Sequence, residues 1–173
     1  MKVINLFGSP GTGKSTTAAG LFFLMKTQGY RVELVTEYAK DLTWSKRDTA
    51  LSDQLYILGK QNHRLQRIKD QVDYAITDSP ILFSNIYAPD NYHDSFEKFV
   101  REVFDSYDNI NFFLKKVKPH VNMGRDLSEA EANIISAEIK SMLLVYGVNH
   151  HTFEGDSNAP QNILDKIKEL ENE

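Results

Sequence analysis

The chain has 173 residues, of which 41% are hydrophobic and 25% are charged, and its formal net charge is −4. This length and composition are typical of one globular domain, so we expect residues 1–173 to form a single domain. The absence of cysteine excludes disulfides and thiolate metal sites. No apolar run is long enough for a membrane span and no leader is recognisable, so we expect a cytoplasmic protein that has no membrane partner.

Predicted strands and helices alternate along the first half of the chain. Apolar runs predict strands, and helical spacing of apolar residues predicts helices. In chain order we expect a strand at Lys2–Phe7, a helix at Lys14–Thr27, a strand at Arg31–Thr36, a polar stretch at Glu37–Thr49, a helix at Ala50–Lys69 and a strand at Tyr74–Thr77.

The second half continues the alternation after a short apolar segment, Ile81–Tyr87, and a turn-rich loop, Ala88–His93. Ser128 and Glu131 have the spacing of a capping box at the start of a helix. In chain order we expect a helix at Ser95–Ser106, a strand at Asn111–Val117, a loop at Lys118–Leu127, a helix at Ser128–Val145, a strand at Asn149–Phe153 and a last helix from about Pro160. This order predicts a three-layer α/β/α fold with a mainly parallel five-stranded sheet.

A glycine-rich segment between the first strand and the first helix has the spacing G-x-x-x-x-G-K-S. In this context the motif is a phosphate-binding loop, whose backbone amides and helix N-terminus face the phosphates of a nucleoside triphosphate. Lys14 would contact the β- and γ-phosphates, and the Ser15 hydroxyl would bind Mg²⁺. The predicted nucleotide-binding residues are Gly8, Ser9, Pro10, Gly11, Thr12, Gly13, Lys14, Ser15 and Thr16.

Carboxylates follow the second and third predicted strands. Parallel sheets bind ligands at the carboxyl ends of their strands, so Glu37 and Asp78 should both face the phosphate-binding loop. Asp78 would hold Mg²⁺ together with Ser15, although Asp at this place is also a common helix N-cap. Glu37 is the candidate base that would take the proton of an acceptor hydroxyl, with Asp41 as the second candidate.

Further candidate groups come from the later segments. Arg125 lies in a Gly-containing stretch at about 118–128, downstream of Lys115 and Lys116. It would belong to a basic lid that neutralises the charge of the transferred group. Gln54 and Gln61 share one face of the long predicted helix, where amides could read a nucleobase, and Tyr38 could stack on it. A polar or core role for these three residues is equally compatible with the pattern.

The class of P-loop protein can be narrowed by the motifs that are missing. No N/T-K-x-D guanine motif occurs, and the third strand is followed by Asp78-Ser79-Pro80 rather than by D-x-x-G. Little chain remains after the fifth strand for the additional elements of a larger motor ATPase. By elimination, a small kinase with an internal lid fits best.

Five segments of the chain carry a family resemblance: the phosphate-binding loop, Thr36-Glu37-Tyr38-Ala39-Lys40, Gln54-Leu55-Tyr56, Thr77-Asp78-Ser79-Pro80 and Gly124-Arg125. Together they resemble a small P-loop kinase family of tailed bacteriophages, whose members are often labelled AAA-family ATPases. The arrangement is also similar to NadR-type nicotinamide riboside kinases and deoxynucleoside kinases, although the latter have an arginine where this chain has Ser79. Phage 5-hydroxymethyluracil DNA kinases and polynucleotide kinases belong to the same broad set.

This resemblance implies ATP- and Mg²⁺-dependent phosphoryl transfer to a hydroxyl of a nucleoside, a nucleotide or a modified nucleobase. The catalytic candidates are thus Lys14, Glu37, Asp78 and Arg125, and the acceptor-side candidates are Glu37, Tyr38, Asp41, Gln54 and Gln61. Two alternatives remain open at this point. One is a kinase that acts on DNA, and the other is a nucleotide-dependent regulatory ATPase that switches its loops.

Overall fold

The computed structural model describes residues 1–117 and 129–172. In this part of the chain, five strands form one sheet in the order β2-β3-β1-β4-β5, and every neighbouring pair is parallel. The strands are β1 (Lys2–Phe7), β2 (Val32–Val35), β3 (Tyr74–Thr77), β4 (Asp108–Lys115) and β5 (His151–Glu154). The predicted fold class is therefore confirmed.

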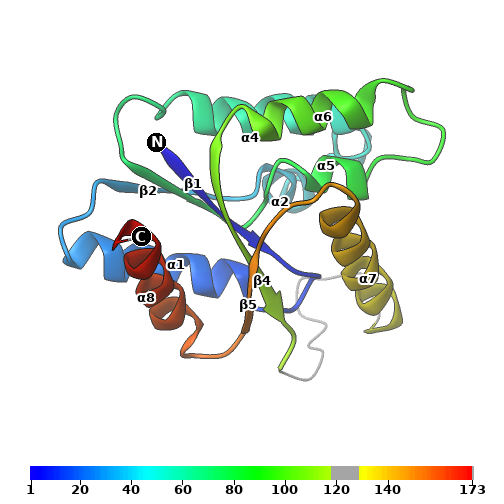
Figure 1. Cartoon of the computed structure of the whole chain (residues 1–173). Helices are drawn as coiled ribbons and strands as arrows, with labels where there is room; N and C mark the ends of the chain where they lie inside the picture. The colour runs from blue at the N-terminus through cyan, green and yellow to red at the C-terminus, as the bar shows by residue number, and fades with distance from the viewer. Residues whose placement is uncertain (118–128, 173) are drawn as a thin grey trace.

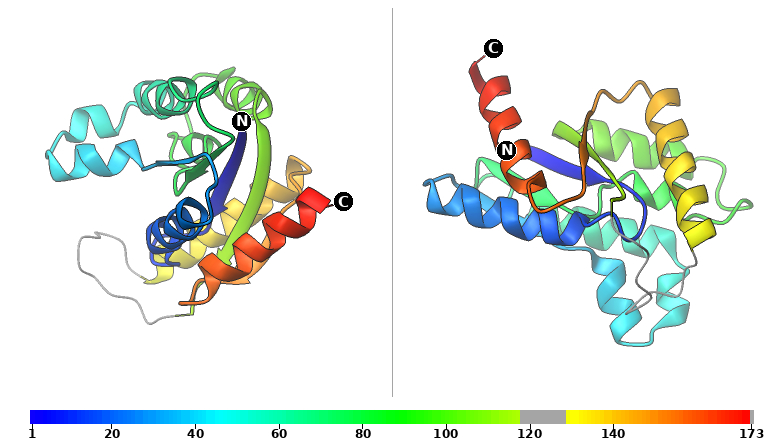
Figure 2. Two further views of the ribbon diagram at one scale, coloured as in Figure 1. Left: turned by 90° about the vertical axis from the view of Figure 1, so that its left-hand side faces the viewer. Right: turned by 90° about the horizontal axis from the view of Figure 1, so that it is seen from below.

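Helices cover both faces of this sheet, which gives the three layers that Figure 1 and Figure 2 show. The helices are α1 (Lys14–Thr27), α2 (Tyr38–Trp44), α3 (Asp48–Leu51), α4 (Gln54–Gln66), α5 (Phe83–Ile86), α6 (Phe96–Asp105), α7 (Glu129–Val145) and α8 (Ala159–Asn172).

Alternating side chains of β1 divide the interior into two apolar cores. Val3 and Phe7 belong to the core under α4, α6 and α7, whereas Ile4 and Leu6 belong to the core under α1 and α8. This pattern explains why the strand is apolar almost throughout, because a parallel sheet with helices on both faces exposes neither side to water. The packing fixes β1, and therefore the loop that follows it, from two sides.

The predicted helix Ala50–Lys69 is wrong in one respect, because the structure has two helices there, α3 and α4. Asp53 lies between them with extended backbone, and its side chain accepts a hydrogen bond from the Tyr56 N–H at 3.0 Å. Asp53 is thus the N-cap of a new helix, as aspartate commonly is. The stretch Glu37–Thr49, expected to be merely polar, contains all of α2.

The fourth strand begins three residues earlier than predicted, at Asp108. The parallel register pairs Lys2 with Asp108 and Val3 with Asn109. The Asn5 amide donates to the side-chain oxygens of Asn109 at 2.8 Å and Asn111 at 3.0 Å. Polar residues can therefore occupy a central strand, because their side chains are hydrogen-bonded to one another.

Candidate active site

The glycine-rich loop joins β1, in the middle of the sheet, to α1. Gly8 and Gly13 have φ values of 143° and 89°, which L side chains rarely adopt. A Cβ on Gly8 would lie 2.7 Å from Thr12 Oγ1 and 2.8 Å from the Leu114 carbonyl oxygen. The Thr12 hydroxyl also donates to the Ser9 carbonyl at 3.0 Å, closing the loop on itself. The tight loop therefore requires glycine at both positions.

Lys14 begins α1, and its ammonium group turns back into this loop. Its Nζ donates to the Gly8 carbonyl at 2.7 Å and to the Ser9 carbonyl at 3.1 Å. Ser15 and Thr16, the next two residues, are exposed at the N-terminal end of the helix. A cation, a hydroxyl group and helix N–H groups thus surround one place, which is the arrangement that binds a phosphate chain.

Asp78 follows β3, the strand that lies beside β1 in the sheet. The side chain is buried, and its Oδ1 accepts a hydrogen bond from the Glu37 N–H at 3.1 Å. This bond connects the end of β3 to the segment that follows β2. The sheet order therefore places the two predicted carboxylate residues next to each other at the loop's edge.

The backbone around Glu37 is held by the side chain of Gln61 from α4. The Gln61 amide oxygen accepts the Tyr38 N–H at 3.0 Å, and its nitrogen donates to the Thr36 carbonyl and to Thr77 Oγ1, both at 3.4 Å. Gln61 is buried, so these hydrogen bonds are shielded from water. The geometry gives Gln61 the role of positioning Glu37, whereas its predicted role in reading a base stays a prediction.

The environment of Glu37 raises the pKa of its carboxyl group above the ordinary value. Burial is the largest cause, and the Asp78 carboxylate adds to it. The nearby Lys14 ammonium acts in the opposite direction. A carboxylate with a raised pKa beside a lysine and a second carboxylate has the chemistry of a general base at a phosphoryl-transfer site.

Aromatic and basic residues lie next to Glu37 on α2 and α4. The Tyr38 and Tyr56 hydroxyls are 2.8 Å apart, and the Arg64 guanidinium lies 5.1 Å from the centre of the Tyr38 ring. Arg64 donates to the Thr36 carbonyl at 2.8 Å and pairs with Asp41. Arg64 is not among the predicted site residues, although it lies three residues after Gln61 and therefore about one helical turn along the same face.

Two other predicted acceptor residues have defined places. Asp41 is engaged by Arg64, as described, and is more than half exposed. Gln54 is buried at the start of α4, where its amide nitrogen donates to the Leu51 carbonyl at 3.3 Å. Tyr87, which is not among the predicted site residues, has a pKa raised to about 12 by burial and by the nearby Glu37 and Glu138 carboxylates.

Mg²⁺ would have few protein ligands at this site. Ser15 and Asp78 are oxygen donors on adjacent segments, and no group of three or more His, Cys, Asp or Glu residues that could hold a metal occurs in the part of the chain that the structure describes. Mg²⁺ commonly takes one or two protein oxygens and completes its octahedron with water and phosphate oxygens. The residues present fit such an ion.

The predicted lid at 118–128, with Arg125, lies outside the described residues. Of the lysines that precede it, Lys115 is 3.9 Å from Glu154 and Lys116 is 2.9 Å from Glu129. These ion pairs join the end of β4 to β5 and to the first turn of α7. The role of Arg125 stays a prediction.

The parallel sheet with a G-x-x-x-x-G-K-S loop between β1 and α1 defines the chain as a P-loop NTPase fold. A sequence model of the family described as "AAA domain" matches residues 3–158, and the chain belongs to that family.

Among solved structures, the thymidylate kinase of Ehrlichia chaffeensis is similar, with a TM-score of 0.61 and 16% sequence identity over 96% of this chain and 98% of that one. No curated protein matches the chain. In the described residues, no helix is both long and apolar enough to span a membrane. The structural likeness supports a fold like that of P-loop nucleotide kinases.

Proposed function

We propose that the protein transfers the γ-phosphoryl group of ATP to a hydroxyl group of a nucleoside, a nucleotide or a modified nucleobase. The observation that carries this proposal is the position of Glu37. Its backbone N–H is hydrogen-bonded to Asp78, and its carboxyl group interacts electrostatically with the Lys14 ammonium. A protein that only binds or slowly hydrolyses nucleotides needs no partly buried base next to its phosphate site. A kinase does need one, to orient the acceptor and take its proton.

Each residue then has a defined task in the transfer. Lys14 and the loop amides bind the phosphates. Ser15 and Asp78 would hold Mg²⁺, which would supply positive charge to neutralise the phosphate oxygens. Glu37 accepts the proton of the acceptor hydroxyl. The hydroxyl oxygen of the acceptor then bonds to the γ-phosphorus while the bond from that phosphorus to ADP breaks and ADP leaves. Arg125, from the proposed lid at 118–128, stabilises the transferring group. Tyr38, Asp41 and Gln54 bind or position the acceptor, while Gln61 holds the backbone on either side of Glu37.

The test is transfer of labelled phosphate from ATP to panels of nucleosides, nucleotides and oligonucleotides. Wild-type protein should label at least one acceptor, and Lys14→Ala should reduce the rate by about 100-fold or more, because a charge-stabilising donor is lost. Lys26→Ala, at the other end of α1, is the matched control and should retain full activity.

Undiminished transfer by Lys14→Ala would reject the proposal. Release of phosphate into water, with no labelled acceptor in any panel, would instead favour the nucleotide-dependent regulator.

A further inference from the structure

Charge is distributed very unevenly along this chain. Residues 38–69, which contain α2, α3 and α4, have seven Lys or Arg and three Asp or Glu, so they carry +4 in a chain whose formal charge is −4. By contrast, a cleft of about 560 Å³ between α5, α6 and α7 is lined by four carboxylate residues, Asp90, Asp94, Glu97 and Glu138. A polyanion would therefore be attracted to the α2–α4 side and repelled from the cleft.

The same segment also exposes aromatic rings. Trp44, at the end of α2, is 73% exposed, and Tyr56, in the first turn of α4, is 38% exposed. Lys60 lies 5.3 Å from the centre of the Tyr56 ring, and Tyr38 meets Tyr56 edge to face at 5.7 Å between ring centres. We call the surface formed by the half-buried Tyr38 and the exposed Trp44, Arg47, Tyr56, Lys60 and Arg67 the α2–α4 basic face.

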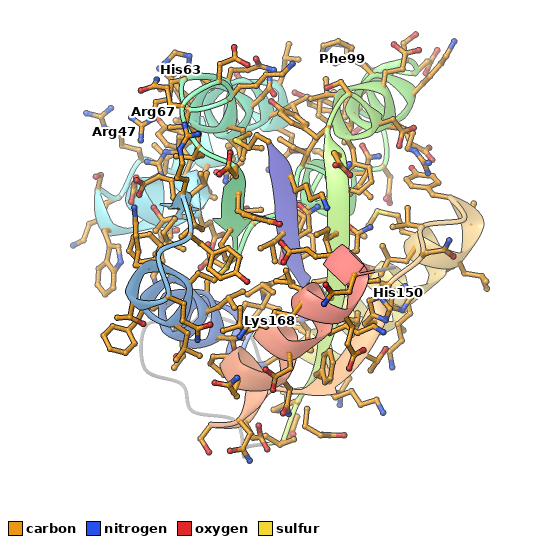
Figure 3. All side chains as sticks on the ribbon, turned by 60° about the vertical axis from the view of Figure 1, so that its left-hand side comes forward. Arg47, His63, Arg67, Phe99, His150 and Lys168 are labelled. Carbon is orange, nitrogen blue, oxygen red and sulfur yellow. The ribbon has the colours of Figure 1, made fainter. Side chains whose placement is uncertain are left out.

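The cations of this face are available to a ligand. Tyr56, Lys60 and Arg67 recur at helical spacing and are all exposed, so they form one stripe along α4 and its C-cap residue, Arg67. Arg47 lies near Tyr38, and none of Arg47, Lys60 and Arg67 forms an ion pair within residues 1–117 and 129–172. Figure 3 shows Arg47 and Arg67, together with His63, on one side of the molecule, and Figure 2 shows α2 and α3 projecting from it.

The length of the basic face indicates what kind of anion fits it. The eleven residue steps from Tyr56 to Arg67, the C-cap of α4, rise about 16 Å along the helix axis. This distance covers several base steps of about 3.4 Å each, and so exceeds a single nucleoside. Stacking rings interleaved with cations along an extended track are how proteins bind single-stranded nucleic acid without reading its sequence.

We propose that the α2–α4 basic face binds a single-stranded nucleic acid. Tyr38 directly follows Glu37, so a strand on this face enters the site beside the candidate base. The acceptor hydroxyl would then be carried by the strand rather than by a free nucleoside. This last step rests on the proposed function, whereas the binding itself does not.

Binding can be measured with the full chain and a fluorescent oligothymidylate, by anisotropy over a range of salt concentrations. Trp44→Ala should weaken binding by about 5- to 150-fold, because a stacking ring is lost. The double variant Lys60→Gln with Arg67→Gln should reduce the magnitude of the log–log salt slope by about 1.4, which is about 0.7 for each lost phosphate contact. All three side chains are exposed, so folding should be unaffected, and circular dichroism would verify this.

Lys168→Gln on α8, which Figure 3 shows away from the basic face, removes one positive charge there and should leave the affinity unchanged. No binding at low salt, or equal weakening by the Lys168 variant, would overturn the proposal. Thymidine monophosphate competing as well as the oligonucleotide would also overturn it, while leaving the kinase proposal intact. Binding of the oligonucleotide without phosphate transfer to any acceptor would reject the kinase proposal and support the proposal that the basic face binds a strand.

Discussion

At the scale of single residues, the site depends on how Glu37 is held. Its N–H is hydrogen-bonded to Asp78, and the residues on either side of it are hydrogen-bonded to Gln61. Three consecutive backbone units are thus fixed by side chains from two other elements. Glu37 itself stays partly accessible, so that the proposed acceptor could reach its carboxyl group. The backbone is rigid where position matters, and the side chain is open where chemistry would occur.

We predict that Glu37→Gln lowers turnover by about 100- to 10,000-fold while leaving ATP affinity nearly unchanged. The amide is close in shape to the carboxylate but cannot accept the proton. Steady-state kinetics and ATP titration would measure the two effects separately. A variant that retains full turnover would show that another group, such as Asp41, is the base.

The raised pKa of Glu37 gives the same variant a second readout. A general base must be ionised, so kcat/KM of the wild type should fall as the pH decreases through the pKa of this carboxyl group. Because burial raises that pKa, the fall should begin at a higher pH than for an ordinary glutamate. The residual activity of Glu37→Gln should not show this decrease of kcat/KM at low pH. If the decrease persists in the variant, a group other than Glu37 causes it.

At the scale of elements, the segment after β5 supports the phosphate-binding loop. Gly155 directly follows β5, and its N–H donates to the Lys115 carbonyl at 2.8 Å. A Cβ at this position would lie 1.9 Å from the Thr12 carbonyl oxygen and 3.0 Å from the Lys115 carbonyl oxygen. The two segments can approach this closely only because residue 155 has no side chain. The segment after β5 and the phosphate-binding loop after β1 are thereby packed backbone to backbone.

Gly155→Ala should therefore displace the loop, weaken ATP binding and lower the free energy of unfolding by about 1–3 kcal/mol. Gly59→Ala is the matched control, since a Cβ there meets no atom within 4 Å and alanine favours a helix by up to about 1 kcal/mol. Denaturant unfolding and ATP titration of both variants would check this. A Gly155 variant with normal affinity and normal stability would contradict the close packing.

At the scale of the whole molecule, the site depends on a sheet that is packed on both faces. Ile163 and Leu164 of α8 are fully buried in the core that also contains Ile4 and Leu6 of β1. Val3 and Phe7 of the same strand pack into the opposite core. Since β1 leads directly into the phosphate-binding loop, both cores hold the loop's starting point in place.

Ile163→Ala should lower the free energy of unfolding by about 2–5 kcal/mol, because a buried aliphatic side chain is replaced by a cavity. The variant leaves every proposed site residue in place. Its catalytic constants well below the melting temperature should therefore stay close to those of the wild type. Thermal unfolding would measure the first effect and kinetics the second, and a loss of less than about 1 kcal/mol would contradict the packing.

Local patterns were sufficient to predict much of this molecule. The bounds of β1, α1 and β3 agree with the prediction, because each is a strong apolar or helical run that ends at a glycine or polar residue. The loop at Gly8–Ser15 is a local motif whose geometry follows from its glycines. The break at Asp53 was missed because one capping aspartate ends a pattern that otherwise looks continuous. The early start of β4 was missed because Asn109 becomes acceptable only when Asn5 lies beside it.

The sequence by itself therefore determined the fold class and the phosphate-binding loop, since both follow from short-range periodicity and from backbone conformations that only glycine adopts readily. Only the tertiary structure decided how the remaining site residues meet. The order β2-β3-β1 brings Glu37 to Asp78, and α4 returns to place Gln61 and Arg64 behind them. These contacts join residues far apart in the chain, and no local pattern encodes the hydrogen bonds that sheet order creates.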